Sequence, residues 1–284
     1  MDAELFDPVA RGGAVLLDYF REENFAYTLR GWRHDPAACF ADSAEAPALL
    51  AERAQLLAQG PDRHLIIQRP ESDTVIVDAA RVLSVVRPDL DFNSDEADPG
   101  RQLARWGRLL EPDLLLLRRD ADGAYRLVAG AVCFPTFWAP EEKLGLPLAA
   151  IHDAVPGLNE NLGEKIQRLM ERLRSDEAWH RINWGLAAGP ERNQHPAAGR
   201  ARLQTDTPAE AISLRMEYQS FLPLLAGEGV LFTIRIFAFP LPEVRRHPAA
   251  AALARQLRTM PEDVARYKGI SPARARAADF LDGG

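Results

Sequence analysis

One stretch organises this chain: Phe134-Pro-Thr-Phe-Trp-Ala-Pro-Glu-Glu-Lys-Leu-Gly-Leu-Pro-Leu-Ala-Ala-Ile-His152-Asp-Ala-Val-Pro156-Gly157. Three aromatic residues and three prolines precede its single histidine, and proline both fixes φ and removes a backbone donor. The stretch therefore predicts a shaped loop and a short helix that hold His152 at a defined place. A neutral imidazole held in this way is a common ligand of a metal or of haem iron. A lone histidine in an apolar stretch is more often a hydrogen-bonded core residue, so both interpretations stand.

The composition is that of an ordinary globular protein. The chain has 284 residues, of which 47% are hydrophobic and 26% charged, enough for one large domain or two small ones. A net charge of −7 gives no field that favours nucleic acid or an anionic membrane, and no apolar run could span a bilayer. The acidic first residues lack a signal-peptide pattern, and two distant cysteines suggest neither a zinc site nor disulfides. We therefore expect a cytoplasmic, reducing location.

The first part of the chain is predicted to be mainly helical. Residues 1–42 carry scattered aromatic residues without a clear period and indicate an irregular arm packed on the main body. Residues 43–59 read as a helix, because Pro47 lies in the first turn and Gly60-Pro61 follows the end. We expect further helices from Asp73, where strand and helix spacings are mixed, and over residues 98–110.

The pattern changes after Pro112. Two apolar runs, 113–118 and 125–133, flank the turn signal Asp122-Gly123 and predict a β-hairpin that leads into the proline-rich stretch. Residues 158–175 have apolar residues at helical spacing, which we interpret as core packing. Strands are expected at 181–186, 211–222 and 231–239, followed by a helical tail. The predicted fold class is α+β: a mostly antiparallel sheet with an inserted helix, wrapped by N- and C-terminal helices.

Alternation within residues 211–222 puts Arg215, Glu217 and Gln219 on one face of a strand, each about 6.6 Å from the next. Such a row is either an exposed sheet surface or the lining of a pocket, where an arginine can bind a carboxylate through two hydrogen bonds. Familiar phosphate-binding, zinc-protease and nucleophile-elbow motifs are absent from the sequence. The basic residues near the C-terminus, including Lys268, are interpreted as solvated helix ends.

These features together resemble the haem-dependent oxidative N-demethylase alpha-subunit-like family over roughly residues 25–255. The matching residues are Phe134-Pro135 with Trp138, Lys143 and Gly145; Ile151-His152 with Val155-Pro156; Arg181 with Asn183-Trp184; Arg215, Glu217 and Gln219; and Phe232 with Ile234. Each motif is weak by itself, but their order along the chain is specific.

The resemblance implies a PAS-like fold that carries haem b. It implies one domain over 1–284, with a helical N-terminal extension (1–110), a PAS-like haem-binding core (111–242) and a helical tail (243–284). In members of this family the iron takes electrons from a separate reductase and activates O2, and a small methylated amine loses a methyl group as formaldehyde. The resemblance thus implies an oxidoreductase of the N-demethylase or monooxygenase type.

The family's site residues carry over by position. His152 would ligate the haem iron, and Arg215 would neutralise a propionate or orient a carboxylate. Either Glu217 or Tyr218 would be the catalytic polar group on the distal side, since adjacent strand residues face opposite ways. The remaining cofactor-binding residues implied by the resemblance are Gln219, Asn183 and Trp184.

Several positions depart from the family pattern. Ala154 replaces a proline, Tyr218 replaces an arginine, arginines expected after Gln219 are absent, and Ile236-Phe237 replace a Thr-Tyr pair. Haem binding needs little more than a histidine and an apolar pocket, so it could survive these changes. The two lost hydroxyls predict a less polar ligand and leave it open whether catalysis is retained.

Two other functions remain alternatives. One is a PAS-like haem or ligand sensor without turnover, and the other is a haem-free relative in which His152 is a core residue. The sequence holds no flavin or iron–sulfur motif, so an enzyme of this kind would need an electron donor on another polypeptide. We expect neither nucleic acid nor membrane as a partner, and a homo-oligomer is compatible with the sequence.

Overall fold

An antiparallel sheet forms the centre of the protein. The computed structural model describes residues 7–21, 23–92, 98–174, 176–224 and 227–283. Within these residues the sheet has seven strands in the order β1-β5-β6-β7-β3-β4-β2. The strands are β1 Gly31–His34, β2 Leu65–Ile67, β3 Asp113–Arg119, β4 Tyr125–Ala131, β5 Ala178–Ala187, β6 Ser213–Pro223 and β7 Gly229–Pro240. Residues 1–6, on which the absence of a signal peptide was argued, lie outside the described residues.

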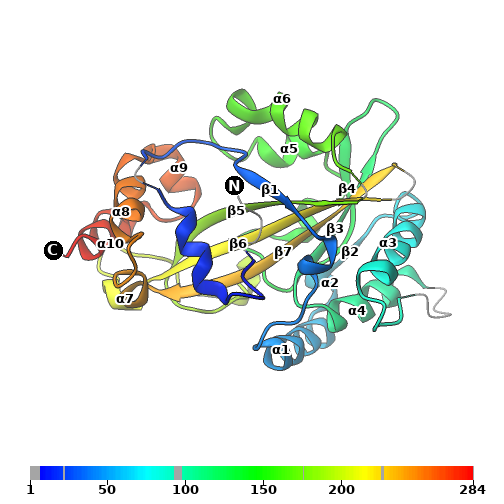
Figure 1. Ribbon diagram of the computed structural model, residues 1–284, viewed down its shortest axis with the longest axis horizontal. Helices are drawn as coiled ribbons and strands as arrows, with labels where there is room; N and C mark the ends of the chain where they lie inside the picture. The colour runs from blue at the N-terminus through cyan, green and yellow to red at the C-terminus, as the bar shows by residue number, and fades with distance from the viewer. Residues whose placement is uncertain (1–6, 22, 93–97, 175, 225–226, 284) are drawn as a thin grey trace.

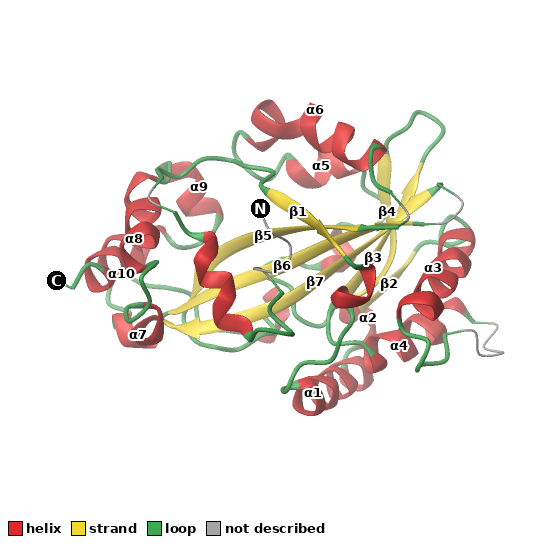
Figure 2. Cartoon of the chain, in the orientation of Figure 1, coloured by secondary structure: helices red, strands yellow, loops and turns green. Residues whose placement is uncertain are grey.

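Helices cover both faces of this sheet (Figures 1 and 2). The helices α5 Leu148–His152 and α6 Leu158–Glu171 are inserted between β4 and β5 and lie on one face, here called the α5/α6 face. The opposite face, called the α3/α4 face, packs against α3 Asp73–Val86 and α4 Pro99–Leu109. The remaining helices are α1 Ala46–Gln59, α2 Pro61–His64, α7 Leu241–Val244, α8 Ala250–Thr259, α9 Glu262–Tyr267 and α10 Arg274–Leu281.

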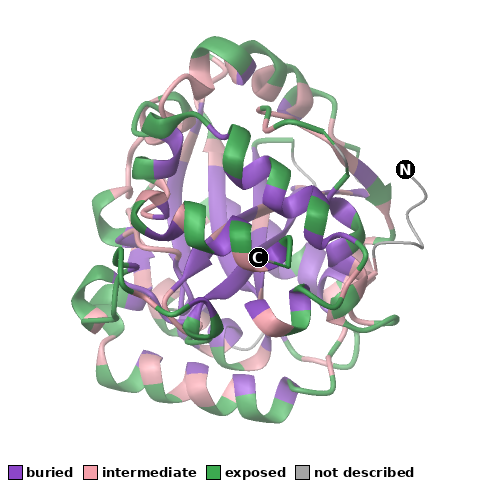
Figure 3. Ribbon diagram, turned by 90° about the vertical axis from the view of Figure 1, so that its left-hand side faces the viewer, coloured by how far each residue is buried: buried purple, intermediate pink, exposed green. Residues whose placement is uncertain are grey.

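The two longest strands, β6 and β7, are buried on both sides. Residues Ser213 to Ser220 of β6 are all buried, and the strand pairs with β5 and β7 along its length. This excludes the interpretation of the polar row of β6 as an exposed sheet surface. Figure 3 shows that the central strands are mostly purple, while the covering helices carry green outward faces.

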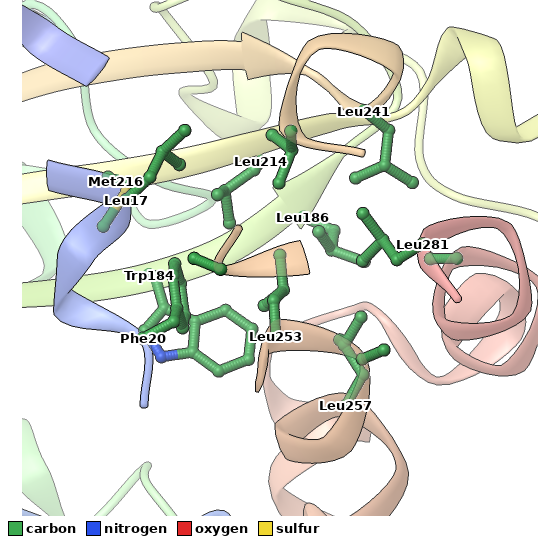
Figure 4. Packing of buried hydrophobic residues seen from close by; sticks show 14 of the residues in the cluster. Leu17, Phe20, Trp184, Leu186, Leu214, Met216, Leu241, Leu253, Leu257 and Leu281 are labelled. Atoms are coloured by element: carbon green, nitrogen blue, oxygen red, sulfur yellow. The ribbon is translucent and has the colours of Figure 1, made fainter. Parts of the chain in front are cut away.

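One end of the α3/α4 face is closed by the two ends of the chain. The 3₁₀ helix η2, Gly13–Tyr19, packs with α8 and α10 on residues of β5 and β6. Figure 4 shows this cluster, in which Leu17, Leu253, Leu257 and Leu281 surround Leu186 and Leu214. Because the C-terminal helices pack here, the tail becomes part of the core and brings Lys268 to β5.

The α+β class is confirmed, and so are the helices expected within residues 43–59 and 98–110, the hairpin and the inserted helix. The N-terminal part differs from a purely helical extension, because it also supplies β1 and β2, the two edge strands of the sheet. Strands of four and three residues are too short to show an alternation that a sequence could reveal. No helix in the described part of the chain is both long and apolar enough to cross a membrane.

Candidate functional site

A cavity of about 260 Å³ lies between α6 and the α5/α6 face of the sheet. Its helical wall is apolar and is formed by Leu148, Leu158, Leu162, Ile166, Leu169 and Met170. The sheet side contributes Leu117, Phe221 and Phe232, and the two phenylalanine rings are stacked with their centroids 4.5 Å apart. The cavity is therefore a space between two largely apolar surfaces.

The apolar residues of α6 face this cavity. We had interpreted their helical spacing as core packing, and Leu162 is indeed buried. However, Leu158, Ile166 and Leu169 are only partly buried, because the helix leaves a gap between itself and the sheet. A helical stripe gives the same sequence pattern whether it meets side chains or a ligand space, so the sequence could not separate the two.

The organising stretch begins at two buried charges that hold its backbone. The Asp113 carboxylate accepts hydrogen bonds from the backbone N–H groups of Cys133 and Phe134, at 2.7 and 3.0 Å, and pairs with the Arg53 guanidinium at 2.7 Å. From the other side, Arg215 donates to the Phe134 carbonyl and to the Thr136 hydroxyl, at 2.7 and 2.8 Å. The loop therefore leaves the sheet in a fixed direction.

His152 ends α5, the short helix that the sequence predicted, and lines the cavity. Burial, together with the positive charge of Arg181, lowers the pKa of the imidazole to about 4, so the ring is neutral at neutral pH. Among the described residues, no hydrogen bond or ion pair engages either ring nitrogen. This contradicts a hydrogen-bonded core histidine and leaves the imidazole free to bind a ligand in the cavity.

The polar row of β6 does not act as one group. Gln219 lines the cavity, whereas Arg215 lies against the 134–136 loop and is not among the lining residues. Burial lowers the pKa of Arg215 to about 10, and its donors are used by the loop. This placement differs from the expected contact with a propionate or carboxylate, and it makes Arg215 a support for the loop that precedes His152.

Glu217 connects the lining residues. Its carboxylate accepts hydrogen bonds from Thr136 at 2.6 Å, from the Gln219 amide at 2.7 Å and from the Asn183 amide at 3.1 Å. Glu217 itself does not line the cavity, but Gln219 and Asn183 do. The carboxylate therefore orients both amides, so that each turns its oxygen away from Glu217.

Tyr218 lies on the α3/α4 face, away from the cavity. Its ring stacks on His180 with centroids 5.0 Å apart and lies 6.0 Å from Trp32, and burial raises the pKa of its hydroxyl. Of the two residues expected as the distal polar group, Tyr218 is thus excluded by position. Glu217 lies on the α5/α6 face, where it is hydrogen-bonded to the cavity-lining residues Gln219 and Asn183.

Trp184 contacts the cavity at one edge. Its ring packs edge-on against Phe20 at 5.3 Å within the cluster of Figure 4, so most of the indole belongs to the core. Its backbone carbonyl accepts a hydrogen bond from the Lys268 ammonium or amine at 2.7 Å. Trp184 therefore fixes the position of a neighbouring cation through its backbone carbonyl.

Two cations at the end of the cavity received no role from the sequence. Arg181 lines the cavity, burial lowers its pKa, and its buried Nε atom has no hydrogen-bond partner. Lys268 also lines it, which contradicts the interpretation of this residue as a solvated helix end. Arg181 lies in a motif that the sequence offered, but Lys268 approaches β5 because the C-terminal helices fold back, which no local pattern reveals.

An extended segment near the N-terminus forms a further wall. Residues 25–29, here called the strap, line the cavity from Phe25 to Leu29. The Tyr27 hydroxyl donates to the Pro156 carbonyl, and the Phe25 N–H donates to the Thr259 hydroxyl at 2.8 Å. The strap thus connects the α5–α6 turn to the C-terminal helices.

Of the positions that depart from the family pattern, Ala154, Tyr218, Ile236 and Phe237 do not line the cavity, whereas Phe221, in the segment that lacks the expected arginines, does. Ile236 is buried in the core beside Glu217, Phe237 stacks on Phe239, and Ala154 is exposed. The cavity lining therefore gives no support to the expectation that the two lost hydroxyls make the ligand space less polar.

The donor atoms present suit a metal that brings most of its own ligands. In the described ranges no group of three or more histidine, cysteine, aspartate or glutamate side chains could hold a metal ion. A neutral imidazole on a largely apolar cavity, with a guanidinium whose Nε has no partner in the described part of the chain, suits an iron porphyrin, whose ring supplies the other ligands and whose propionates need a cation. Comparison with family models matches residues 50–278 to the haem-dependent oxidative N-demethylase, alpha subunit-like family.

Proposed function

The chain belongs to the haem-dependent oxidative N-demethylase, alpha subunit-like family, and from this we propose that its cavity holds haem b with His152 as an axial ligand. The observation that carries the proposal is the imidazole of His152, which is neutral, faces an apolar cavity and has no protein partner among the described residues. Bound haem would supply the activation of O2. The fold class around it is compatible with a PAS-like core.

The apolar walls and the cation would have separate tasks. The leucine and phenylalanine side chains would exclude water from both faces of the macrocycle. Arg181 would pair with a propionate, because a guanidinium whose Nε lacks a partner gains a charge-assisted hydrogen bond there. This assigns to Arg181 the role that the resemblance implied for Arg215.

The amides on the sheet side would face the substrate. Gln219 is held by Glu217, so its oxygen can accept a hydrogen bond from an N–H group in the cavity, whereas the Asn183 oxygen already accepts one from Lys268. A small methylated amine offers such a donor and an apolar methyl group for the surrounding rings. We therefore infer oxidative removal of a methyl group from a small amine, with electrons from a separate reductase.

The cavity is too small for a porphyrin unless its walls move. Pockets for drug-sized ligands measure roughly 300–1,000 Å³, and the present space of about 260 Å³ is below that range. A porphyrin therefore requires the strap and α6 to move apart. Such a movement would break the hydrogen bonds of Phe25 and Tyr27 to Thr259 and Pro156 and separate the two rings from the core cluster on which they pack.

Catalysis and haem binding can be tested in one experiment. Haem-loaded protein with an electron donor is expected to release formaldehyde from di- and trimethylamine in an oxygen-dependent reaction, and His152→Ala should remove this activity. His247→Ala, a change outside the cavity, is the matched control. Spectroscopically intact haem without formaldehyde release would support the sensor alternative instead.

A further inference from the structure

Lysine is rare in this chain, and one lysine lies at the cavity. The sequence holds 34 lysine and arginine residues, and its three lysines are Lys143, Lys165 and Lys268. Arginine makes the buried ion pairs with Asp113 and Glu111 and the surface pairs alike. A lysine at the cavity of such a chain indicates a need for an amine, since a guanidinium is always charged and an amine can lose its proton.

Two acceptors hold the Nζ atom of Lys268 at the cavity. Lys268 follows α9, and its Nζ atom lies 2.7 Å from the Trp184 carbonyl and 3.2 Å from the Asn183 side-chain oxygen. An ammonium has three N–H donors, whereas a neutral amine has two. These two acceptors satisfy both N–H groups of the amine and leave its lone pair for another partner.

The surroundings of Lys268 favour loss of the proton. Burial is the largest effect on its pKa, and Arg181 on β5 acts in the same direction, while Glu217 on β6 opposes both. The net result lowers the pKa of Lys268 to about 8. The Trp184 ring, with its centroid 5.8 Å from Nζ, offers the charged form some compensation.

We propose that Lys268 is a covalent capture site for an aldehyde in the cavity. The nitrogen lone pair forms a bond to the carbonyl carbon, the carbonyl oxygen takes up a proton, and the carbinolamine then loses water to give an imine. No oxidant or reductant is consumed. That the natural aldehyde is formaldehyde rests on the proposed function, whereas the reactivity of the amine does not.

A purely structural lysine would behave differently. If Nζ served only to hold the end of α9 against β5, arginine could replace it, because a guanidinium reaches the same acceptors with more donors. Capture, in contrast, needs an amine that is partly neutral near pH 7. At that pH an amine of pKa about 8 is roughly 9% neutral and an ordinary lysine about 0.03%, a difference of about 300-fold.

The test uses formaldehyde with cyanoborohydride, which reduces the imine to a stable methylated lysine. Purified full-length protein, with and without haem, is treated between about pH 6 and pH 10, and peptide mass spectrometry follows each lysine. Lys268 is expected to react at least about 10-fold faster than exposed Lys165 at pH 7, with a midpoint near pH 8. Lys165 and Lys143 are controls within the same molecule. A Lys268 that reacts no faster than Lys165, or only at the alkaline end of the range, overturns the proposal.

A variant and the activity assay separate the two proposals. Lys268→Arg should abolish methylation at this site while its thermal unfolding stays near that of the wild type. If that variant does not fold, the pH profile of the wild type still decides. Rapid capture by a protein that binds no haem would leave the amine proposal standing and refute the demethylase. A demethylating protein with an unreactive Lys268 would refute capture alone.

Discussion

Asp113 joins the sheet to the stretch that carries His152. Its carboxylate is 1% exposed, accepts two backbone hydrogen bonds from that stretch and pairs with an equally buried Arg53. Removing one partner of a buried pair costs far more than the pair contributes, because the other charge stays buried without compensation. The direction in which the loop leaves β4 therefore depends on this one residue.

Asp113→Ala should lower the free energy of unfolding by about 3–5 kcal/mol, because Arg53 and two backbone N–H groups lose their acceptor. Urea denaturation followed by circular dichroism measures this change. The control is Glu164→Ala, which removes an ion pair to Arg168 at the surface of α6 and should cost less than about 1 kcal/mol. Equal losses for the two variants would contradict the assigned role of Asp113.

His180 makes stability depend on pH. It is fully buried beside Tyr218 and accepts or donates to Ser220 at 3.0 Å, and burial lowers its pKa to about 3. Below about pH 6.5 the unfolded chain binds a proton that the folded chain excludes until about pH 3. The contribution of His180 to the free energy of unfolding is thus fully present above pH 6.5. It decreases as the pH falls, by up to about 1.4 kcal/mol per pH unit.

His180→Gln removes this titration and keeps a polar side chain for Ser220. We expect the free energy of unfolding of the wild type to fall more steeply than that of the variant between about pH 6.5 and pH 4. Urea denaturation at a series of pH values gives both curves. Parallel curves would show that the imidazole is protonated as readily in the folded protein as in the unfolded one.

Among the elements, the strap is the one whose movement the proposed function requires. Its residues lie outside the family match of 50–278, so this wall of the cavity belongs to the part of the chain that the family model does not describe. Helix α6 forms the facing wall and begins after Gly157, whose φ of 69° suits glycine and ends the α5–α6 turn. The Tyr27 hydroxyl connects the strap to that turn.

Tyr27→Phe should loosen the strap by removing its hydrogen bond to the Pro156 carbonyl. The loss of about 0.5–1.5 kcal/mol is expected to accelerate hydrogen exchange of strap amides up to about tenfold, while β6 and β7 exchange as before. Exchange read by mass spectrometry resolves the two regions. Tyr125→Phe, which removes the hydroxyl that β4 donates to the Met170 carbonyl of α6, should leave the strap unchanged. A strap that exchanges at the wild-type rate in the Tyr27 variant would contradict its anchoring by this bond.

At the scale of the whole molecule, the features that could be predicted from the sequence are those that depend on residues close together in the chain. The hairpin from Asp113, the strand that carries Gln219 and the placement of His152 follow from local alternation, turn residues and prolines. Lys268 reaches the cavity through packing of the chain ends on β5, and Arg215 turns to a loop that is distant in sequence. Such contacts arise from tertiary packing, which leaves no periodic mark on the sequence.

The central claim is that the cavity holds haem on His152, and the visible absorption spectrum of the protein purified from haem-replete cells tests it most directly. We predict a Soret band that shifts on reduction and again with carbon monoxide, in the wild type and in His247→Ala, and that is lost or altered in His152→Ala. A colourless wild-type protein, or a His152→Ala spectrum identical to that of the wild type, would contradict the account.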